Sequence, residues 1–212
     1  MKASAREWAS DPAAPGLVLH TPEGRPYRFD AGALCLELLT TGGPGSYGRH
    51  EALDEPDALV AWAQRSRLTP GLELSVSEAE LGAARAVRDA LLRLTLARVH
   101  DLTPDEADLA TLNTAAAGPP LVPRMTRDGG RAWAPGATGT GLLSAVARDA
   151  VELFTGPYAH RIRECGSPDC SLLFVDTSRP GHRRWCAMER CGNRHKARAH
   201  RARGRGTPAP GA

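Results

Sequence analysis

The chain has 212 residues, a length that allows one ordinary domain with a small appendage or two small domains. Hydrophobic residues make up 42% and aromatic residues only 5%, so a core must be built from Ala, Leu and Val, which favours packed helices over an aromatic-rich β-sandwich. No apolar run reaches about 18 residues and the N-terminus has no apolar leader, so we expect a cytoplasmic protein with no membrane partner.

Charge is distributed unevenly along the chain, although the net charge is only +3. Residues 161–206 contain twelve Arg or Lys and four Asp or Glu, a balance of +8, whereas the remainder has fifteen basic and twenty acidic residues, a balance of −5. We therefore expect the C-terminal part of the chain, and not the rest, to attract polyanions.

The first elements expected in chain order are two short strands. Residues 1–16 have the composition of a flexible N-terminus, and strand-forming runs at 16–20 and 25–30 flank turn formers at 22–24, which predicts a hairpin. A second hairpin is expected at residues 128–130, where Asp-Gly-Gly lies between strand-tolerant residues.

Apolar residues at helical spacing predict five helices. They cover residues 31–41, 55–67, 75–101, 103–118 and 138–156. In the longest helix Ser77 is a good N-cap and Glu80 completes a capping box, while Thr103 followed by Pro104 is expected to cap the next helix. Cys35 has no Cys or His nearby in the sequence and is expected to be a small buried hydrophobe.

Four cysteines lie in two pairs of equal spacing near the C-terminus. Cys165 and Cys170 are separated by four residues, as are Cys186 and Cys191, and fifteen residues lie between the pairs. Two chelating turns joined by such a connector suit tetrahedral zinc, and four thiolates leave no open position for water, so we expect one structural Zn²⁺ per chain. Two disulfides and unbound thiols are the alternatives. Histidines that could replace a ligand are His160, His182, His195 and His200.

The order of elements around the cysteines is a tight turn at 166–169, a strand at 171–177, a polar loop, and a helix after Cys191. This order resembles a treble-clef zinc module. A module of about 45 residues buries too little apolar surface to fold without its metal. Its miniature core is expected to contain Phe174, Leu172, Trp185 and Met188.

The helix after the last cysteine is expected to be basic and to bind nucleic acid. From Arg194 onward arginines follow one helical face, which fits the DNA major groove in width and charge. Asn193 and Arg194 are able to make bidentate contacts with bases. The candidate contacts are Arg183, Arg184, Asn193, Arg194, Lys196, Arg198, Arg201 and Arg203. RNA, a protein partner, and an intramolecular role for the basic face are the alternatives.

The predicted fold class is mainly α (α+β), with a boundary near residues 157–160 where the composition becomes basic. A helical domain with a small hairpin is expected at 17–157, a treble-clef-like zinc module at 158–203, and a disordered tail at 204–212. No catalytic set of residues is present, so we do not expect an enzyme. An active site in the helical domain, with zinc as a scaffold only, is the alternative.

Residues 191–194 read Cys-Gly-Asn-Arg, and segment 160–203 around them resembles the CGNR zinc-finger family. In that family the finger follows a helical region, the ABATE domain, which residues 33–41 and 54–68 resemble. The resemblance implies a bacterial, stress-related transcription regulator whose zinc ligands are the four paired cysteines. The helical domain would sense a small-molecule effector or mediate homodimerisation. Thr40-Thr41 stands where the family has an Asn-Thr pair, so no effector-binding residue is transferred.

Overall fold

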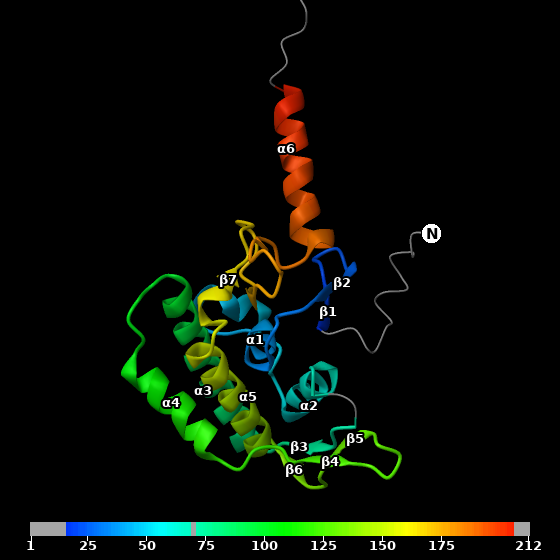
Figure 1. Ribbon diagram of the computed structural model, residues 1–212, viewed down its shortest axis with the longest axis vertical. Helices are drawn as coiled ribbons and strands as arrows, with labels where there is room; N and C mark the ends of the chain where they lie inside the picture. Colours follow the sequence, from blue (N-terminus) through cyan, green and yellow to red (C-terminus); the bar gives the residue numbers. More distant parts are fainter. Residues whose placement is uncertain (1–15, 69–70, 206–212) are drawn as a thin grey trace, which may run out of the picture.

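Three long helices form the body of the protein: α3 (Glu78–Val99), α4 (Glu106–Ala117) and α5 (Gly139–Thr155) (Figure 1). Each of them packs against the other two in this computed structural model, which describes residues 16–68 and 71–205. The stripe of leucine, alanine and valine predicted on the longest helix faces its neighbours and is buried. The body is therefore the packed helical core that the aliphatic composition favours.

The helix starts follow from their capping residues. Ser77 accepts a hydrogen bond from the Glu80 N–H (3.3 Å), and the Glu80 carboxylate accepts one from the Ser77 N–H (2.9 Å), so the predicted capping box is confirmed. The prediction that Thr103 caps α4 is wrong. The Asp105 carboxylate caps this helix instead, because it accepts a hydrogen bond from the Ala107 N–H (2.8 Å).

A short helix, α1 (Leu34–Leu38), continues as the 3-10 turn η2 (Leu39–Thr41). It begins later than predicted because Gly32 has a φ of 80°, in the left-handed region. Cys35 is buried, as predicted, and its N–H donates to the Asp149 carboxylate of α5 (2.8 Å).

The 3-10 segment η3 (Gly45–His50) and helix α2 (Pro56–Arg65) follow η2. A buried Trp62 on α2 donates from its indole to the Glu37 carbonyl (3.3 Å), which ties α2 to α1.

The described strands form four two-stranded sheets. Their bounds are β1 (Leu17–His20), β2 (Pro26–Phe29), β3 (Leu74–Ser75), β4 (Pro123–Met125), β5 (Arg131–Trp133), β6 (Ala137–Thr138), β7 (Ile162–Glu164) and β8 (Leu173–Val175). Both predicted hairpins, β1–β2 and β4–β5, are antiparallel, with Leu17 opposite Phe29 and Pro123 opposite Trp133. The parallel β3–β6 pair and strand β7 were not predicted. The fold class, mainly α with small β elements, is confirmed.

The hydrophobic core continues across the boundary expected near residues 157–160. The same buried cluster contains the leucines of the helical body, the residues of β8 and the four paired cysteines. Strand β8 is anchored to the N-terminal part, because the Val175 N–H donates to the Ala31 carbonyl (2.9 Å). A Cβ on Gly32 would lie 2.9 Å from the Val175 Cβ, so glycine permits this close approach.

Helix α6 (Asn193–Arg205) differs from the rest, because it projects from the body along the long axis of the molecule (Figure 1). It continues through Gly204 and Arg205, two residues into the tail predicted to be disordered. The rest of that tail, and the predicted flexible N-terminus up to residue 15, lie outside the described residues. Among the helices that the structure describes, none has both the length and the apolar character needed to cross a membrane.

Candidate metal centre

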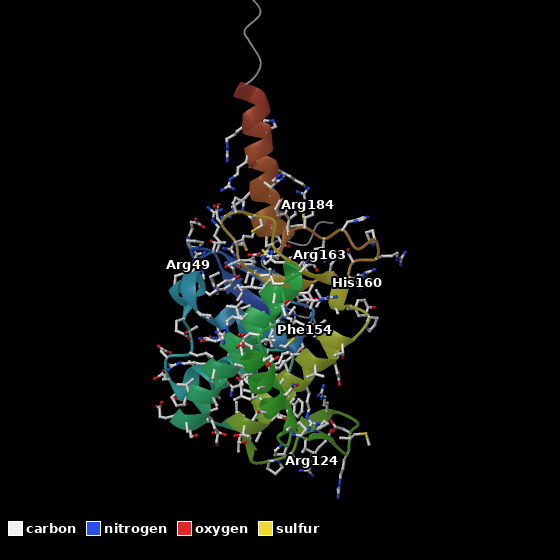
Figure 2. The ribbon with its side chains drawn as sticks, turned by 90° about the vertical axis from the view of Figure 1, so that its left-hand side faces the viewer. Arg49, Arg124, Phe154, His160, Arg163 and Arg184 are labelled. Atoms are coloured by element: carbon white, nitrogen blue, oxygen red, sulfur yellow. The ribbon has the colours of Figure 1, made fainter. Side chains whose placement is uncertain are left out.

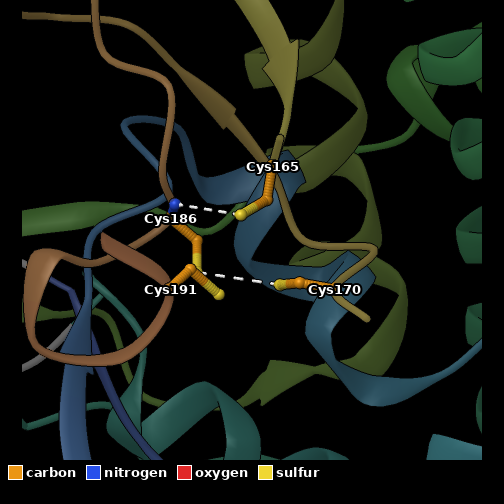
Figure 3. Close-up of side chains that lie close together, drawn as sticks. All are labelled: Cys165, Cys170, Cys186 and Cys191. Carbon is orange, nitrogen blue, oxygen red and sulfur yellow. Dashed lines mark hydrogen bonds between the residues drawn. The ribbon is translucent and has the colours of Figure 1, made fainter. Parts of the chain in front are cut away.

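The four paired cysteines converge on one point (Figure 3). Their sulfur atoms all lie within 4.8 Å of one another, with Cys170 Sγ 3.7 Å from Cys186 Sγ and Cys186 Sγ 3.6 Å from Cys191 Sγ. Zn–S bonds of about 2.3 Å in a tetrahedron require sulfurs about 3.8 Å apart. All four side chains are buried, so the geometry and the soft donor set fit one structural Zn²⁺ and leave no room for a catalytic water.

Two turns hold the cysteine pairs in place. Cys165 follows β7, and its N–H donates to the Leu172 carbonyl (2.9 Å), while the Cys170 N–H donates to the Ser167 carbonyl (2.9 Å). Residues 165–172 therefore form the tight knuckle that the turn formers predict, and this segment is called the zinc knuckle below.

The second pair lies on a loop and on one turn of π-helix, η5 (Met188–Gly192). The N–H groups of Cys191 and Gly192 both donate to the Ala187 carbonyl (3.1 and 3.2 Å). A Cβ on Gly192 would lie 2.6 Å from the Met188 sulfur, so the glycine of the motif provides space for packing. The wide π turn directs Cys191 towards the other sulfurs immediately before α6 begins.

The thiols share protons when no cation balances them. Hydrogen bonding to Cys170 and Cys186 lowers the pKa of Cys165, while the hydrogen bond to Cys165 raises the pKa of both Cys170 and Cys186. A bound divalent cation removes this competition, because a coordinating thiol is deprotonated outright. The mutual perturbation of the thiols thus follows from the same close approach that fits the metal.

Arg190 lies next to the sulfurs and can balance part of the negative charge of a zinc tetrathiolate. Its Nη1 donates to the Tyr27 hydroxyl (2.6 Å) and approaches Cys170 Sγ (3.9 Å). Because Tyr27 belongs to β2, this contact also joins the metal centre to the N-terminal hairpin.

Arg183, a predicted nucleic-acid contact, is used inside the protein. Its guanidinium lies over the Phe174 ring at 4.1 Å and donates to the backbone carbonyls of Asp30 (3.0 Å), Trp185 (3.1 Å) and Cys186 (2.5 Å). These contacts hold the loop before the second cysteine pair against the core. The guanidinium of Arg183 therefore has a structural role that requires no nucleic-acid ligand.

Asp176 is a structural residue that the sequence interpretation missed. Its carboxylate is 1% exposed and accepts hydrogen bonds from the Ser178 N–H (3.0 Å), the Ser178 hydroxyl (2.5 Å) and the Arg183 N–H (2.9 Å). Burial acts to raise its pKa, but these hydrogen bonds outweigh burial and lower it. The Asp-Thr-Ser sequence, typical of a turn closed by an Asp side chain, is the signal that could have revealed this role.

The start of α6 rests on the zinc knuckle. Arg198 Nη2 donates to the Asp169 carboxylate (2.6 Å), and Arg194 Nη2 approaches the same carboxylate (3.4 Å) and the Ser167 hydroxyl (3.3 Å). The His195 ring packs against Trp185, with 4.8 Å between ring centroids. One face of the helix is therefore turned towards the protein.

The other predicted contacts remain at the surface. Asn193, Lys196 and Arg201 are exposed, and none of their side chains makes a hydrogen bond or ion pair in the part of the chain that the structure describes. Arg184 is exposed near the base of α6, with its guanidinium over the Trp185 ring at 5.3 Å (Figure 2). Arg203 lies on α6, but its side chain is outside the described residues.

The predicted miniature core is only partly correct. Phe174 is fully buried, and Leu172 and Trp185 are half-buried against the core. Met188 is 49% exposed, so its assignment to the core is wrong: the π turn places its side chain over Gly192 at the surface. No histidine joins the metal cluster among the described residues, and the four cysteines make up the whole group.

Two family models match the chain. One, ABATE, described as "putative stress-induced transcription regulator", matches residues 32–157, more than half of the chain. The chain belongs to the ABATE family. The other, the CGNR zinc finger, matches residues 161–204 of this ABATE-family protein and contains all four sulfur ligands, which confirms the architecture implied by the resemblance. Both are regulator and zinc-finger families rather than enzyme families. No curated protein matches the chain.

Proposed function

We propose that this ABATE-family protein is a DNA-binding transcription regulator of the bacterial cytoplasm, in which the zinc centre positions helix α6 and α6 contacts DNA. The observation that carries the proposal is the projection of α6 from the body (Figure 1), together with the many basic residues and the absence of acidic ones in the sequence after Glu189. The helical part (17–157) would receive the regulatory signal, and the finger (158–203) would deliver it.

The exposed face of α6 is the proposed DNA-contacting surface. Lys196 and Arg201 have no partner in the described part of the chain, so both are available to phosphates, and Asn193 lies at the helix start, where it could reach a base edge. Arg194 and Arg198 would exchange Asp169 for phosphate oxygens. Their present contacts resemble phosphate contacts, because a carboxylate is an anionic oxygen acceptor.

An open groove of about 790 Å³ borders the base of α6 on one side and extends this surface. Its lining includes Arg184, Trp185 and Met188, and so combines a positive charge, an aromatic ring and a flexible apolar side chain.

The test compares two pairs of exposed basic residues at opposite ends of the molecule. Lys196→Gln with Arg201→Gln removes two charges from α6, whereas Arg124→Gln with Arg127→Gln removes two from the β4–β5 hairpin, far from α6 (Figure 2). Fluorescence anisotropy measures the affinity of the zinc-loaded full chain for a pool of random DNA duplexes at several salt concentrations.

We expect the α6 pair to weaken duplex binding at least about tenfold and to reduce the slope of log K against log[salt] by about 2, because two phosphate contacts are lost. The hairpin pair should change neither quantity. Equal losses from the two pairs would show that only net charge matters. Absence of duplex binding by the unmodified chain, or tighter binding of a matched RNA pool, would overturn the proposal.

A further inference from the structure

A cavity of about 300 Å³ lies between the helical part and the zinc knuckle. One side is formed by the β1–β2 hairpin and the η2–η3 segment, and the other by residues 169–172 and Arg190. The walls therefore come from both ends of the chain, and one of them carries the zinc ligand Cys170.

The acidic groups of the walls are already paired with arginines, whereas Arg49 has no anionic partner in the described part of the chain. Glu51 accepts two hydrogen bonds from the buried guanidinium of Arg88 (2.7 and 2.8 Å), and Asp169 is engaged by Arg198. Arg49 has no carboxylate partner in the described part of the chain, and its Nε donates to the neutral imidazole of His50 (3.0 Å). Because zinc thiolates share the charge of Arg190, Arg49 is the cationic group of the walls that has no anionic partner in the described part of the chain.

Hydrogen-bond donors also outnumber free acceptors around the cavity. The Nε–H of Arg190 is buried and has no acceptor, although Nη1 of the same guanidinium is bonded to Tyr27. Burial raises the pKa of Tyr47 to about 12, so its phenol keeps its proton as a further donor. Burial, followed by the nearby charges of Arg49 and Arg190, lowers the pKa of His50 and keeps it neutral. An acceptor that enters this space would meet the donors of Arg49 and Tyr47, which line it.

The remaining walls combine polar side chains (His20, Thr40 and Ser171) with apolar ones. Leu19, Leu39 and Leu172 contribute aliphatic surface, and the rings of Tyr27 and Tyr47 contribute aromatic surface. A cavity in which apolar surface and convergent polar groups meet can take a small molecule, and this volume lies at the small end of the range of such sites. We propose that the cavity binds a small organic anion, with an apolar body between the leucines and tyrosines and a carboxylate or phosphate beside Arg49.

Such a ligand would contact the segment that holds α6. Asp169, on the cavity wall, accepts the hydrogen bond from Arg198, and Arg190 immediately precedes the zinc ligand that leads into α6. Occupancy of the cavity would therefore change the orientation of α6 through the zinc knuckle. This regulatory consequence rests on the proposed function, whereas binding of the anion does not.

The experiment uses benzoate as the probe, benzamide as its neutral analogue, and inorganic phosphate as an anion without an apolar body. Isothermal titration calorimetry with the zinc-loaded full chain measures all three. Arg49→Gln removes the exposed guanidinium from the cavity rim, and Arg124→Gln is the matched control at the opposite end of the molecule. Thermal unfolding checks that both variants remain folded, and no nucleic acid is present, so the outcome is independent of DNA binding.

We expect benzoate to bind at least about tenfold more tightly than benzamide or phosphate, and Arg49→Gln to weaken it by a similar factor, while Arg124→Gln leaves it unchanged. No saturable benzoate binding at millimolar concentration, equal affinity for benzamide, or full affinity in a folded Arg49→Gln variant would overturn the proposal. Tighter binding of phosphate than of benzoate would refute the apolar part of the site.

Discussion

Strand β8 and helix α6 belong to the same zinc finger, but different forces hold them. The three residues of β8, Leu173–Val175, are buried in the core that they share with the helical body. In α6, every described side chain between His195 and Arg201 is exposed. Burial of apolar surface holds β8, whereas α6 depends on the π turn at Cys191, the packing of His195 and the contacts to Asp169.

The finger therefore has two parts: a buried part around β8, which holds the finger to the body, and a presenting part, α6, which extends into solvent. Strand β8 connects the metal centre with the body, so zinc organises a loop that is already anchored on one side. Helix α6 has no such second anchor in the described structure. Changes at the metal centre should therefore affect α6 first and the body last.

Removal of zinc should have the largest effect on the difference in stability between α6 and the helical body. Zinc-finger peptides bind their metal with roughly 10–16 kcal/mol, so chelation, or Cys170→Ser, should destabilise the finger by several kcal/mol. Hydrogen exchange is expected to increase most in residues 185–198 and least in α3, with β8 between them. The control is Cys35→Ala, which alters a buried cysteine outside the cluster and should leave the zinc content unchanged. Equal loss of protection in α3 and α6 would show that the finger and the body unfold as one unit.

The next largest effect should come from the core of the finger. Phe174→Ala removes a fully buried ring that also supports Arg183, and should lower the free energy of unfolding by about 3–5 kcal/mol. Met188→Ala, on an exposed side chain of the same finger, should change it by no more than about 0.5 kcal/mol. Urea unfolding measures both. Similar costs for the two variants would contradict the division into a buried and a presenting part.

The smallest effect on stability is expected at the contact that orients α6. Asp169→Asn weakens the exposed ion pairs with Arg194 and Arg198, so the melting temperature should hardly change. Hydrogen exchange in the first turns of α6 should nevertheless become faster, and duplex affinity should rise slightly because two arginines are released. Asp128→Asn, at the tip of the β4–β5 hairpin, makes the same change in net charge. Identical behaviour of the two variants would rule out an orienting role for Asp169.

Features that depend on neighbouring residues were predictable from the sequence. The capping box of α3 joins residues three positions apart, so its geometry follows from the helix itself. The zinc ligands were predictable for a related reason, since Cys-x₄-Cys pairs restrict each turn to a chelating geometry. The cap of α4 was nevertheless predicted wrongly. The Asp105 carboxylate, which is preferred over a threonine hydroxyl as an N-cap, caps this helix instead of Thr103.

Features that depend on distant contacts were not predictable. Strand β7 has three residues, too few for a periodic pattern, and it forms only because the knuckle folds β8 back along it. The exposure of Met188 follows from the π turn, which no apolar spacing indicates. The cavity between η3 and the knuckle brings Arg49 near Arg190 only after both ends of the chain have packed together.

The amino-acid sequence alone thus determines the helices, the four sulfur ligands and a basic C-terminal helix, since each of these arises from short-range geometry or from composition. Only the folded chain assigns the arginines to different tasks: Arg183 to the core, Arg190 to the metal centre, Arg198 to Asp169, and Arg201 to the open surface. The physical reason is that an arginine's role depends on the acceptor nearest to its guanidinium, and these acceptors come from elements that are distant in sequence.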